Sequence, residues 1–351
     1  MLDPQAAALI QLMTDRQVPP THTLSPADAR RMYLERRFYT QPKPPPVGSV
    51  QNLATPGGVP LRLYKPEGSA EGSAAGALPV LVYFHGGGWT MGDLDTHDVL
   101  CRQLCAGAGV AVVSVDYRLG PEHRFPAAVD DCVAATRWLQ AQDTATALGL
   151  DARRVAVGGD SAGGNLAAVV ALSLRDLQGG AGVGRAADAA DASDGAHAAH
   201  AVHATDSAAA AQPAPLAFQL LIYPATDMRC QAESHFRSGQ GYVLTADTVT
   251  YFRGHYMADP AQYSDWRASP LLASSHHHLP PALVLTAGYD PLLDEGRQYA
   301  DTLSAAGNRV QYVCFERQIH GFVPMGRVLD EARSAVALCC AVLKEALAAD
   351  A

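Results

Sequence analysis

Nearly continuous apolar runs recur along the chain from residue 79 onward. They are Val80–Phe84, Val110–Val115, Val155–Val157, Phe218–Tyr223 and Ala282–Leu285. A strand that is covered on both faces is apolar at almost every position, so these runs predict the central strands of a parallel sheet. Val310–Phe315 alternates more between apolar and polar residues, which is typical of an edge strand.

Stretches with helical periodicity separate these strands. They are Thr96–Ala106, Ala127–Ala141, Asn165–Leu177, Asp294–Ala306 and Leu329–Ala348. Strands that alternate with helices imply right-handed crossovers, and hence an α/β fold with a doubly wound sheet. Two further strands are expected upstream, at Ser49–Ala54 and Pro60–Tyr64, joined by a turn at Pro56–Gly58.

Residues 1–45 differ from the rest of the chain. They predict two short helices, and the second begins at a Ser25 N-cap followed by proline. The run Pro42–Pro46 forbids helix and is expected to be a stiff linker. We therefore expect residues 1–45 to form a separate helical unit ahead of a main domain at residues 46–351.

Two segments interrupt the alternation of strand and helix. Residues 181–214 are almost half alanine without apolar periodicity, which is typical of a low-complexity insertion. We interpret their three histidines, at 197, 200 and 203, as solvated rather than metal-binding. Residues 226–269 are rich in aromatic side chains and lie between two predicted strands. An excursion of that length is usually functional, for example a lid.

Composition excludes several classes of protein. Lysine and arginine number 26 against 35 acidic residues, a net charge of −9, so nucleic acid is not an expected partner. No apolar stretch is long enough to span a membrane, and no secretory signal is recognisable at the start. The seven cysteines form no Cys-x-x-Cys pair, so they predict core thiols in the cytoplasm. A homo-oligomer is compatible with all of this.

The sequence Gly159-Asp160-Ser161-Ala162-Gly163-Gly164 carries the strongest chemical signal. It follows the strand Val155–Val157 directly and precedes a predicted helix. A nucleophilic serine on a strand-to-helix turn needs small neighbours, because this turn is tight and strained. The helix N-terminus behind Ser161 would add partial positive charge where an oxyanion forms.

A glycine loop, His85-Gly86-Gly87-Gly88, follows the strand Val80–Phe84. Glycines let backbone N–H groups approach a substrate carbonyl closely. We expect the amides of Gly86, Gly87 and Ala162 to form an oxyanion hole. His85 is expected to orient the loop rather than to act as a base.

An acid and a base are expected at the carboxyl ends of later strands. Asp290 comes just past the strand Ala282–Leu285, and His320 lies in the loop after Val310–Phe315. The order Ser161, Asp290, His320 is that of the catalytic triad in α/β-hydrolases. Asp294 and Glu295 have a sufficient explanation as residues of the first turn of a helix. The run 276–278, three histidines, is interpreted as a polar loop rather than a metal site.

These motifs resemble the hormone-sensitive-lipase-like family of α/β-hydrolases, a group of bacterial esterases and lipases. The matching segments span roughly residues 80–325 and are His85–Trp89, Asp116–Glu122, Phe125–Ala128, Gly159–Gly164, Leu221–Pro224, Asp290–Gly296 and His320–Phe322. Gly120 stands where the family more often has alanine, and the insertion at 181–214 is a second departure.

The resemblance implies an α/β-hydrolase fold, a doubly wound and mostly parallel sheet with a helical cap. Residues 1–45 and 226–269 would form that cap. It also implies a serine carboxylesterase that cleaves small-molecule esters with short to medium acyl chains through an acyl-enzyme. No metal and no organic cofactor would be required. Trp89 and the aromatic residues of the cap would contact the substrate.

Other functions use the same residues. An amide hydrolase, a deacetylase or a lactone hydrolase would need the same triad. Plant gibberellin receptors resemble the family without being enzymes, but they lack the catalytic histidine that this chain has at His320. The order His85, Asp116, Ser161 is that of chymotrypsin-like proteases. Those proteases are all-β, so the alternation of strands and helices excludes them.

Overall fold

The computed structural model describes residues 1–69, 76–179 and 214–348. The described residues form an eight-stranded sheet in the order β1-β2-β4-β3-β5-β6-β7-β8. The strands are β1 (Ser49–Ala54), β2 (Pro60–Lys65), β3 (Leu78–Phe84), β4 (Ala111–Val115), β5 (Leu150–Asp160), β6 (Phe218–Ile222), β7 (Ala282–Tyr289) and β8 (Val310–Ile319). All eight predicted strands are present, and β8 lies at an edge as expected.

The sheet is mostly parallel. The β1–β2 and β2–β4 pairings are antiparallel. The other five pairings, β4–β3, β3–β5, β5–β6, β6–β7 and β7–β8, are parallel. This confirms the predicted doubly wound α/β-hydrolase fold. Strand β5 begins at Leu150, earlier than predicted, because Leu150 pairs with Leu78 of β3 across a register shift.

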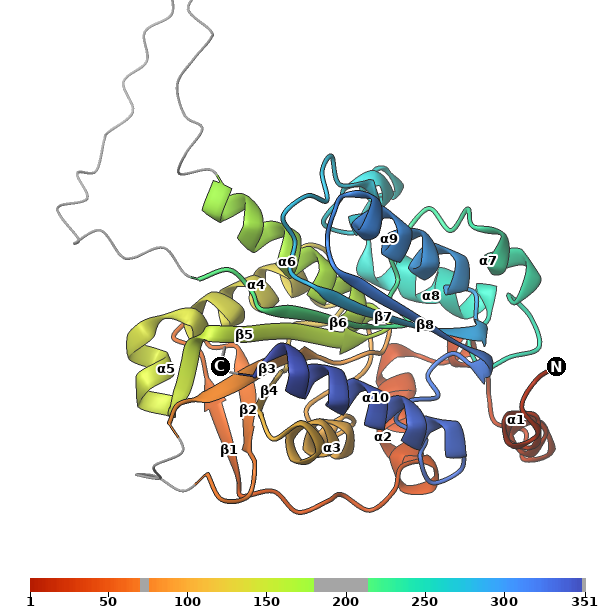
Figure 1. Ribbon diagram of the computed structural model, residues 1–351. Helices are drawn as coiled ribbons and strands as arrows, with labels where there is room; N and C mark the ends of the chain where they lie inside the picture. Colours follow the sequence, from red (N-terminus) through yellow and green to blue (C-terminus); the bar gives the residue numbers. More distant parts are fainter. Residues whose placement is uncertain (70–75, 180–213, 349–351) are drawn as a thin grey trace, which may run out of the picture.

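Helices cover both faces of the sheet (Figure 1). Helices α3 (Asp98–Ala108) and α10 (Asp330–Ala346) pack on one face, and α4 (Ala127–Gln140), α6 (Ala162–Gly179) and α9 (Leu293–Ala305) pack on the other. Successive side chains of β3 point to opposite faces of the sheet. Val80 and Val82 belong to the core under α4, α6 and α9, and Leu81 belongs to the core under α3 and α10. A short helix that was not predicted separately, α5 (Gln142–Leu148), leads into β5.

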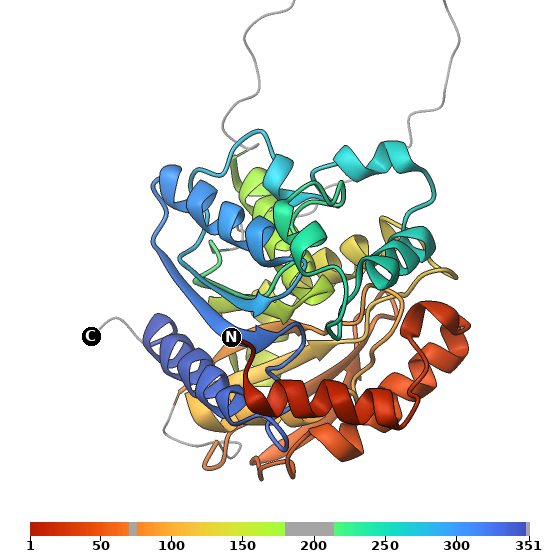
Figure 2. The ribbon, with the colours of Figure 1, turned by 90° about the vertical axis from the view of Figure 1, so that its right-hand side faces the viewer.

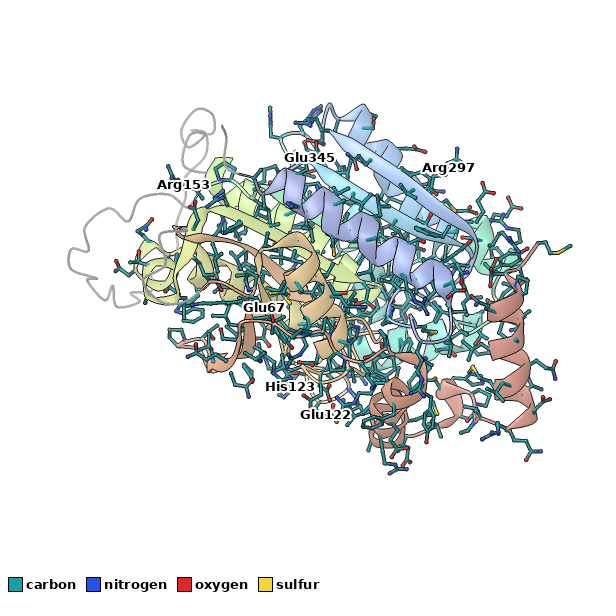
Figure 3. The ribbon with its side chains drawn as sticks, turned by 60° about the horizontal axis from the view of Figure 1, so that its bottom comes forward. Glu67, Glu122, His123, Arg153, Arg297 and Glu345 are labelled. Carbon is teal, nitrogen blue, oxygen red and sulfur yellow. The ribbon has the colours of Figure 1, made fainter. Side chains whose placement is uncertain are left out.

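Two helices precede the sheet, α1 (Pro4–Asp15) and α2 (Pro26–Thr40), with a short 3₁₀ turn η1 (Thr21–Thr23) between them. The predicted N-cap is confirmed, since the Ser25 side chain accepts a hydrogen bond from the Asp28 amide at 3.2 Å. Arg30 of α2 forms an ion pair with Glu122 at 2.6 Å, and Glu122 lies beside the N-terminal helices in Figure 3. This contact fastens α2 to the loops of the main domain.

The aromatic segment between β6 and β7 is helical in part. It contains α7 (Glu233–Arg237), α8 (Ala246–Tyr256) and the 3₁₀ turns η2 (Pro260–Ser264) and η3 (Pro270–Leu272). Helices α2, α7 and α8 lie at the end of the sheet where the parallel strands finish (Figures 1 and 2). The predicted insertion at 181–214, with its three histidines, lies outside the described residues except for Ala214. No helix in the described ranges is long and apolar enough to cross a membrane.

Candidate active site

Ser161 occupies the single position between β5 and α6. Its φ is 57°, in the left-handed region that non-glycine residues seldom adopt. The neighbours hold it there, since its N–H donates a hydrogen bond to the Ile222 carbonyl at 2.8 Å. A Cβ on Gly163 would overlap the carbonyl oxygen of Phe84, so only glycine allows this turn to pack against β3. The strain and the small neighbours are those that the sequence predicted.

The structure brings the three predicted catalytic side chains together. His320 Nε2 lies 2.9 Å from Ser161 Oγ, and His320 Nδ1 lies 2.7 Å from Asp290 Oδ2. Asp290 is fully buried, and its second oxygen accepts a hydrogen bond from the Leu292 amide at 2.8 Å. The Asp290 carboxylate is therefore fixed in place. The imidazole of His320 bridges this carboxylate and the Ser161 hydroxyl through its two nitrogens.

The neighbouring acids do not compete for His320. Asp294 accepts a hydrogen bond from the Ser234 amide at 2.8 Å and lies 3.3 Å from Arg237, so it connects α9 to α7. Glu295 is buried, which the interpretation as a first-turn residue did not foresee. It accepts a hydrogen bond from the Thr226 amide at 2.7 Å.

Glu295 also meets His235 of α7 at 2.6 Å. Burial raises the pKa of the Glu295 carboxyl, and the hydrogen bond from His235 opposes that rise. Glu295 thus ties the segment after β6 to the helix that follows the triad acid. Only the long-range packing of α7 on α9 reveals this role, because the sequence places the two residues 60 positions apart.

The glycine loop corrects one predicted site residue. The N–H of Gly86 donates a hydrogen bond to Asp160 Oδ1 at 2.9 Å, so this amide is occupied. Among the described residues, the amides of Gly87 and Gly88 donate no hydrogen bond, and both glycines line the cavity next to Ser161. Gly86 therefore holds the loop in place, and its amide, which the sequence analysis assigned to the oxyanion hole, is already engaged by Asp160.

Asp160 anchors the glycine loop, a role that the sequence analysis did not assign. Besides Gly86, it accepts a hydrogen bond from the Tyr83 hydroxyl at 2.8 Å and pairs with His97 at 3.1 Å. Burial by itself would raise the pKa of Asp160, but His97 and these hydrogen bonds bring its pKa below the ordinary value. The buried carboxylate is thus charged and fully engaged.

His85 is structural, as expected. It is fully buried, its ring stacks on Tyr117 with centroids 4.3 Å apart, and its Nδ1 lies 3.0 Å from the Gly86 carbonyl. Burial lowers the pKa of His85 to about 4, so the ring is neutral near pH 7. Among the described residues it forms no hydrogen bond with Ser161, Asp290 or His320.

A cavity of about 1020 Å³, including its open mouth, lies over Ser161 and His320. Its walls come from α2, the loop after β3, the segment after β6, α8 and the loop after β8. They include Met32, Tyr33, Arg36, Trp89, Met91, Met228, Leu244, Val249, Phe252, Arg253 and Met325. Sequence analysis anticipated a cap but not which helix faces would line the cavity.

Trp89 lines this cavity and is 5% exposed, with its ring stacked on Tyr256 of α8 at 4.8 Å between centroids. Phe252 also lines the cavity, whereas Phe236 is 78% exposed. Aromatic richness alone therefore did not identify which of these residues face the substrate.

No metal centre is present among the described residues, where no group of histidine, cysteine or carboxylate side chains is arranged to hold an ion. In the 276–278 run, His276 lies 2.9 Å from the Pro270 carbonyl and His277 lies 2.9 Å from the Ala306 carbonyl. These contacts fit the polar loop that the sequence predicted.

A family model described as the alpha/beta hydrolase fold matches residues 81–324. The chain belongs to this family, and within it to the hormone-sensitive-lipase-like group that the motifs indicated.

Named relatives make the class more specific. The chain is 38% identical to ethyl acetate hydrolase of Pseudomonas putida, over 99% of each chain. It is 40% identical to the carboxylic ester hydrolase LipN of Mycobacterium tuberculosis, over 84% of this chain and 70% of LipN. The predicted class, carboxylic ester hydrolase, is confirmed.

Solved structures agree with this class. An α/β-hydrolase enzyme from the metagenome of Lake Arreo, Spain, superposes with a TM-score of 0.83 at 38% identity, covering 98% of both chains. The esterase of Pyrobaculum calidifontis superposes with a TM-score of 0.79 at 34% identity, covering 99% of this chain and 100% of the other. The similarity includes residues 1–45 and the segment after β6, because nearly the whole chain is covered.

Proposed function

We propose that this protein is a serine carboxylesterase in which Ser161 is the nucleophile, His320 the general base and Asp290 the acid that orients the imidazole. The observation that carries the proposal is the pair of contacts at His320, 2.9 Å to Ser161 and 2.7 Å to Asp290. A serine is a weak nucleophile unless a positioned base removes its proton during attack. Asp290 keeps the tautomer in which Nε2 can accept that proton.

In the first half of the reaction, Ser161 Oγ attacks the ester carbonyl carbon while its proton passes to His320. The carbonyl oxygen becomes an oxyanion, for which we propose the amides of Gly87, Gly88 and Ala162 as donors. Removal of one such donor typically lowers kcat by about a hundredfold or more. The carbon–oxygen bond to the alcohol then breaks, and His320 returns the proton to the departing alcohol.

In the second half, water replaces the alcohol. His320 takes a proton from that water as the water attacks the acyl carbon, and the proton then returns to Ser161 as the acid is released. His320 thus carries one proton from Ser161 to the alcohol and a second proton from water to Ser161, so the triad ends in its starting state.

We also propose substrates with short to medium acyl chains. The cavity over Ser161 is lined largely by apolar side chains, among them Met228, Leu244, Val249 and Phe252, which suit a short hydrocarbon acyl group. Residues 1–45 and 226–269 would act as the cap, since α2 and α8 both contribute to the cavity walls. The methionines there, Met32, Met91 and Met325, are flexible enough to fit acyl groups of different shape.

We propose the cytoplasm as the compartment, because all seven cysteines are free and five of them are buried. The acidic net charge supports a small-molecule substrate rather than nucleic acid. A homo-oligomer stays a prediction, which light scattering of the purified protein tests.

The central test is substitution of the nucleophile. Ser161→Ala should reduce turnover of p-nitrophenyl butyrate to the level of the buffer. Ser173→Ala is the matched control, because Ser173 lies on the same helix and only donates a hydrogen bond to the Val169 carbonyl at 2.7 Å. Turnover that survives in the Ser161 variant would contradict the proposal.

The acyl range needs its own measurement. A series of p-nitrophenyl esters from acetate to palmitate, together with an acetylated amide and a lactone, should give the highest kcat/KM for the short and medium esters. Preference for palmitate would contradict the proposed range, and preference for the amide or the lactone would contradict the esterase assignment.

A further inference from the structure

The charged residues that line the cavity differ in whether they have partners. Asp227 pairs with Arg229 at 2.8 Å, and Glu295 meets His235 at 2.6 Å. The Arg253 guanidinium donates a hydrogen bond to a backbone carbonyl, that of Met228, at 2.9 Å. These groups are therefore engaged by the protein itself.

Arg36 is the exception among the lining residues that the structure describes. Its side chain has neither an ion pair nor a backbone carbonyl as a partner there, whereas Arg253 has the Met228 carbonyl, Arg30 pairs with Glu122 and Arg31 pairs with Asp28. Arg36 is half-buried, so water screens its charge only in part, and an anion bound beside it would be attracted more strongly than on the open surface.

The position of Arg36 on α2 is set by the helix. Met32, Tyr33 and Arg36 all line the cavity, and their spacing of three and four places them on one helix face. The guanidinium lies over the Tyr33 ring, 4.7 Å from its centroid. Stacking on an aromatic face restricts the plane of the guanidinium while leaving its N–H groups available at the edge.

A guanidinium held in this way matches one ligand chemistry best. Its planar fork can donate two parallel hydrogen bonds to a carboxylate, and such charge-assisted pairs are stronger than neutral ones. An uncharged acyl chain has no oxygen that could accept these two hydrogen bonds, so the guanidinium would not strengthen its binding.

We propose that this esterase favours esters that carry a carboxylate elsewhere in the molecule, with Arg36 as the specificity-determining residue that binds this carboxylate. The inference rests on the proposed function, since it places the scissile ester at Ser161 and the carboxylate toward α2. The carboxylate belongs either to the acyl part or to the alcohol part of the ester, and matched substrates separate the two.

The first experiment compares charged and neutral substrates of similar shape with the unmodified protein. Monoethyl succinate and ethyl levulinate form the acyl-side pair, and 4-acetoxybutanoate and 5-acetoxy-2-pentanone form the alcohol-side pair. In at least one pair the carboxylate ester should have the higher kcat/KM. That advantage should shrink as sodium chloride is raised, because salt screens a partly exposed charge pair.

The second experiment tests Arg36 itself through the ratio of kcat/KM for the charged ester to kcat/KM for the neutral ester. Arg36→Gln should lower this ratio by about tenfold or more in the preferred pair, a usual size for one charge-assisted contact. Arg36→Lys should retain part of the ratio, because it keeps the charge but not the fork. Arg31→Gln, an exposed arginine on the same helix, should leave the ratio unchanged.

The outcomes separate the inference from the proposed function. If the neutral esters are hydrolysed by the unmodified protein but neither pair favours the charged member, the inference is wrong and the esterase mechanism stands. An equal ratio in Arg36→Gln and the unmodified protein would show that Arg36 only packs on Tyr33. Loss of all hydrolysis in Ser161→Ala is expected under either result, and retained hydrolysis there would remove the basis of both.

Discussion

Two aspartates four positions apart in the sequence have different tasks. Asp290 is fully buried against His320, whereas Asp294 binds the amide of Ser234 in α7. Both lie near the end of β7, so sequence position alone favours Asp290 over Asp294 as the triad acid only slightly. The difference comes from the turn after β7, in which the Leu292 amide bonds to Asp290.

Asp290→Asn should therefore lower kcat by roughly 10⁴-fold, because the amide supports the wrong imidazole tautomer. Asp294→Asn makes the same exchange of a carboxylate for an amide, but at a residue that does not bond to His320. It should therefore lower kcat far less. Steady-state kinetics of both variants with p-nitrophenyl butyrate compares them directly. If Asp294→Asn caused the larger loss, the assignment of the acid would be wrong.

His85 gives the protein a specific response to acid. Its pKa is lowered by burial from 6.5 to about 4, so the unfolded chain takes up a proton at a pH where the folded chain does not. The stabilisation from the neutral ring is fully present above pH 6.5 and is lost as the pH falls toward 4. This group should reduce the free energy of unfolding by about 1.4 kcal/mol per pH unit in that window.

Urea unfolding at several pH values between 7 and 4.5 measures that slope. His85→Gln removes the titrating group, so its free energy of unfolding should fall less steeply with acid, whatever its value at pH 7. His277→Gln is the control, since His277 is exposed. Equal slopes in all three proteins would count against the pKa assigned to His85.

At the scale of the element, helix α2 matters more than its distance in sequence suggests. It lies more than a hundred residues before Ser161, yet its residues form one wall of the cavity. Arg30 fastens it, with hydrogen bonds to the Thr90 and Gly120 carbonyls, both at 2.8 Å, and the pair with Glu122. The hydrogen bond from Arg30 lowers the pKa of Glu122 to about 2, so this pair stays intact until strongly acid pH.

Arg30→Gln should loosen α2 and raise KM for p-nitrophenyl butyrate several-fold, with a smaller effect on kcat, because the triad is not touched. A change of this size corresponds to about 1 kcal/mol. Arg31→Gln removes only an exposed pair on the same helix and should leave KM unaltered. An unchanged KM in Arg30→Gln would mean that α2 is held by its other contacts.

The elements differ in how far the sequence predicted them. The strands were predictable because burial on both faces makes them apolar throughout, and Ser161, Asp290 and His320 because each follows such a strand. Gly86 was misassigned because its hydrogen-bond acceptor, Asp160, is 74 residues away and two glycine amides look alike in a sequence. The cavity walls depend on how the fold brings α2 and α8 to the same cavity, which no local pattern records.

At the scale of the whole molecule, stability comes from packing without covalent cross-links. All seven cysteines are free, and burial raises the pKa of each thiol, including that of Cys230 to about 12. Cys314 is only half-buried, and its pKa is raised for the same reason. Thiolates react and thiols do not, so the native protein should resist thiol reagents.

A disulfide-exchange reagent should therefore label few thiols at pH 7.5 in the folded protein and seven in denaturant. The melting temperature should be the same with and without dithiothreitol. A count below seven in denaturant without reductant would reveal a disulfide and contradict both the structure and the proposed compartment.

The active site is gathered from almost the full length of the chain. Arg36 and Tyr33 come from the first 40 residues, Ser161 from the middle and His320 from the last 40, and the Asp3 amide donates to the Arg317 carbonyl at 2.9 Å. A ribosome must thus release nearly the whole polypeptide before any hydrolysis can begin. Esterase turnover in a translation extract would consequently report chains that extend past His320 and remain silent for those truncated before it.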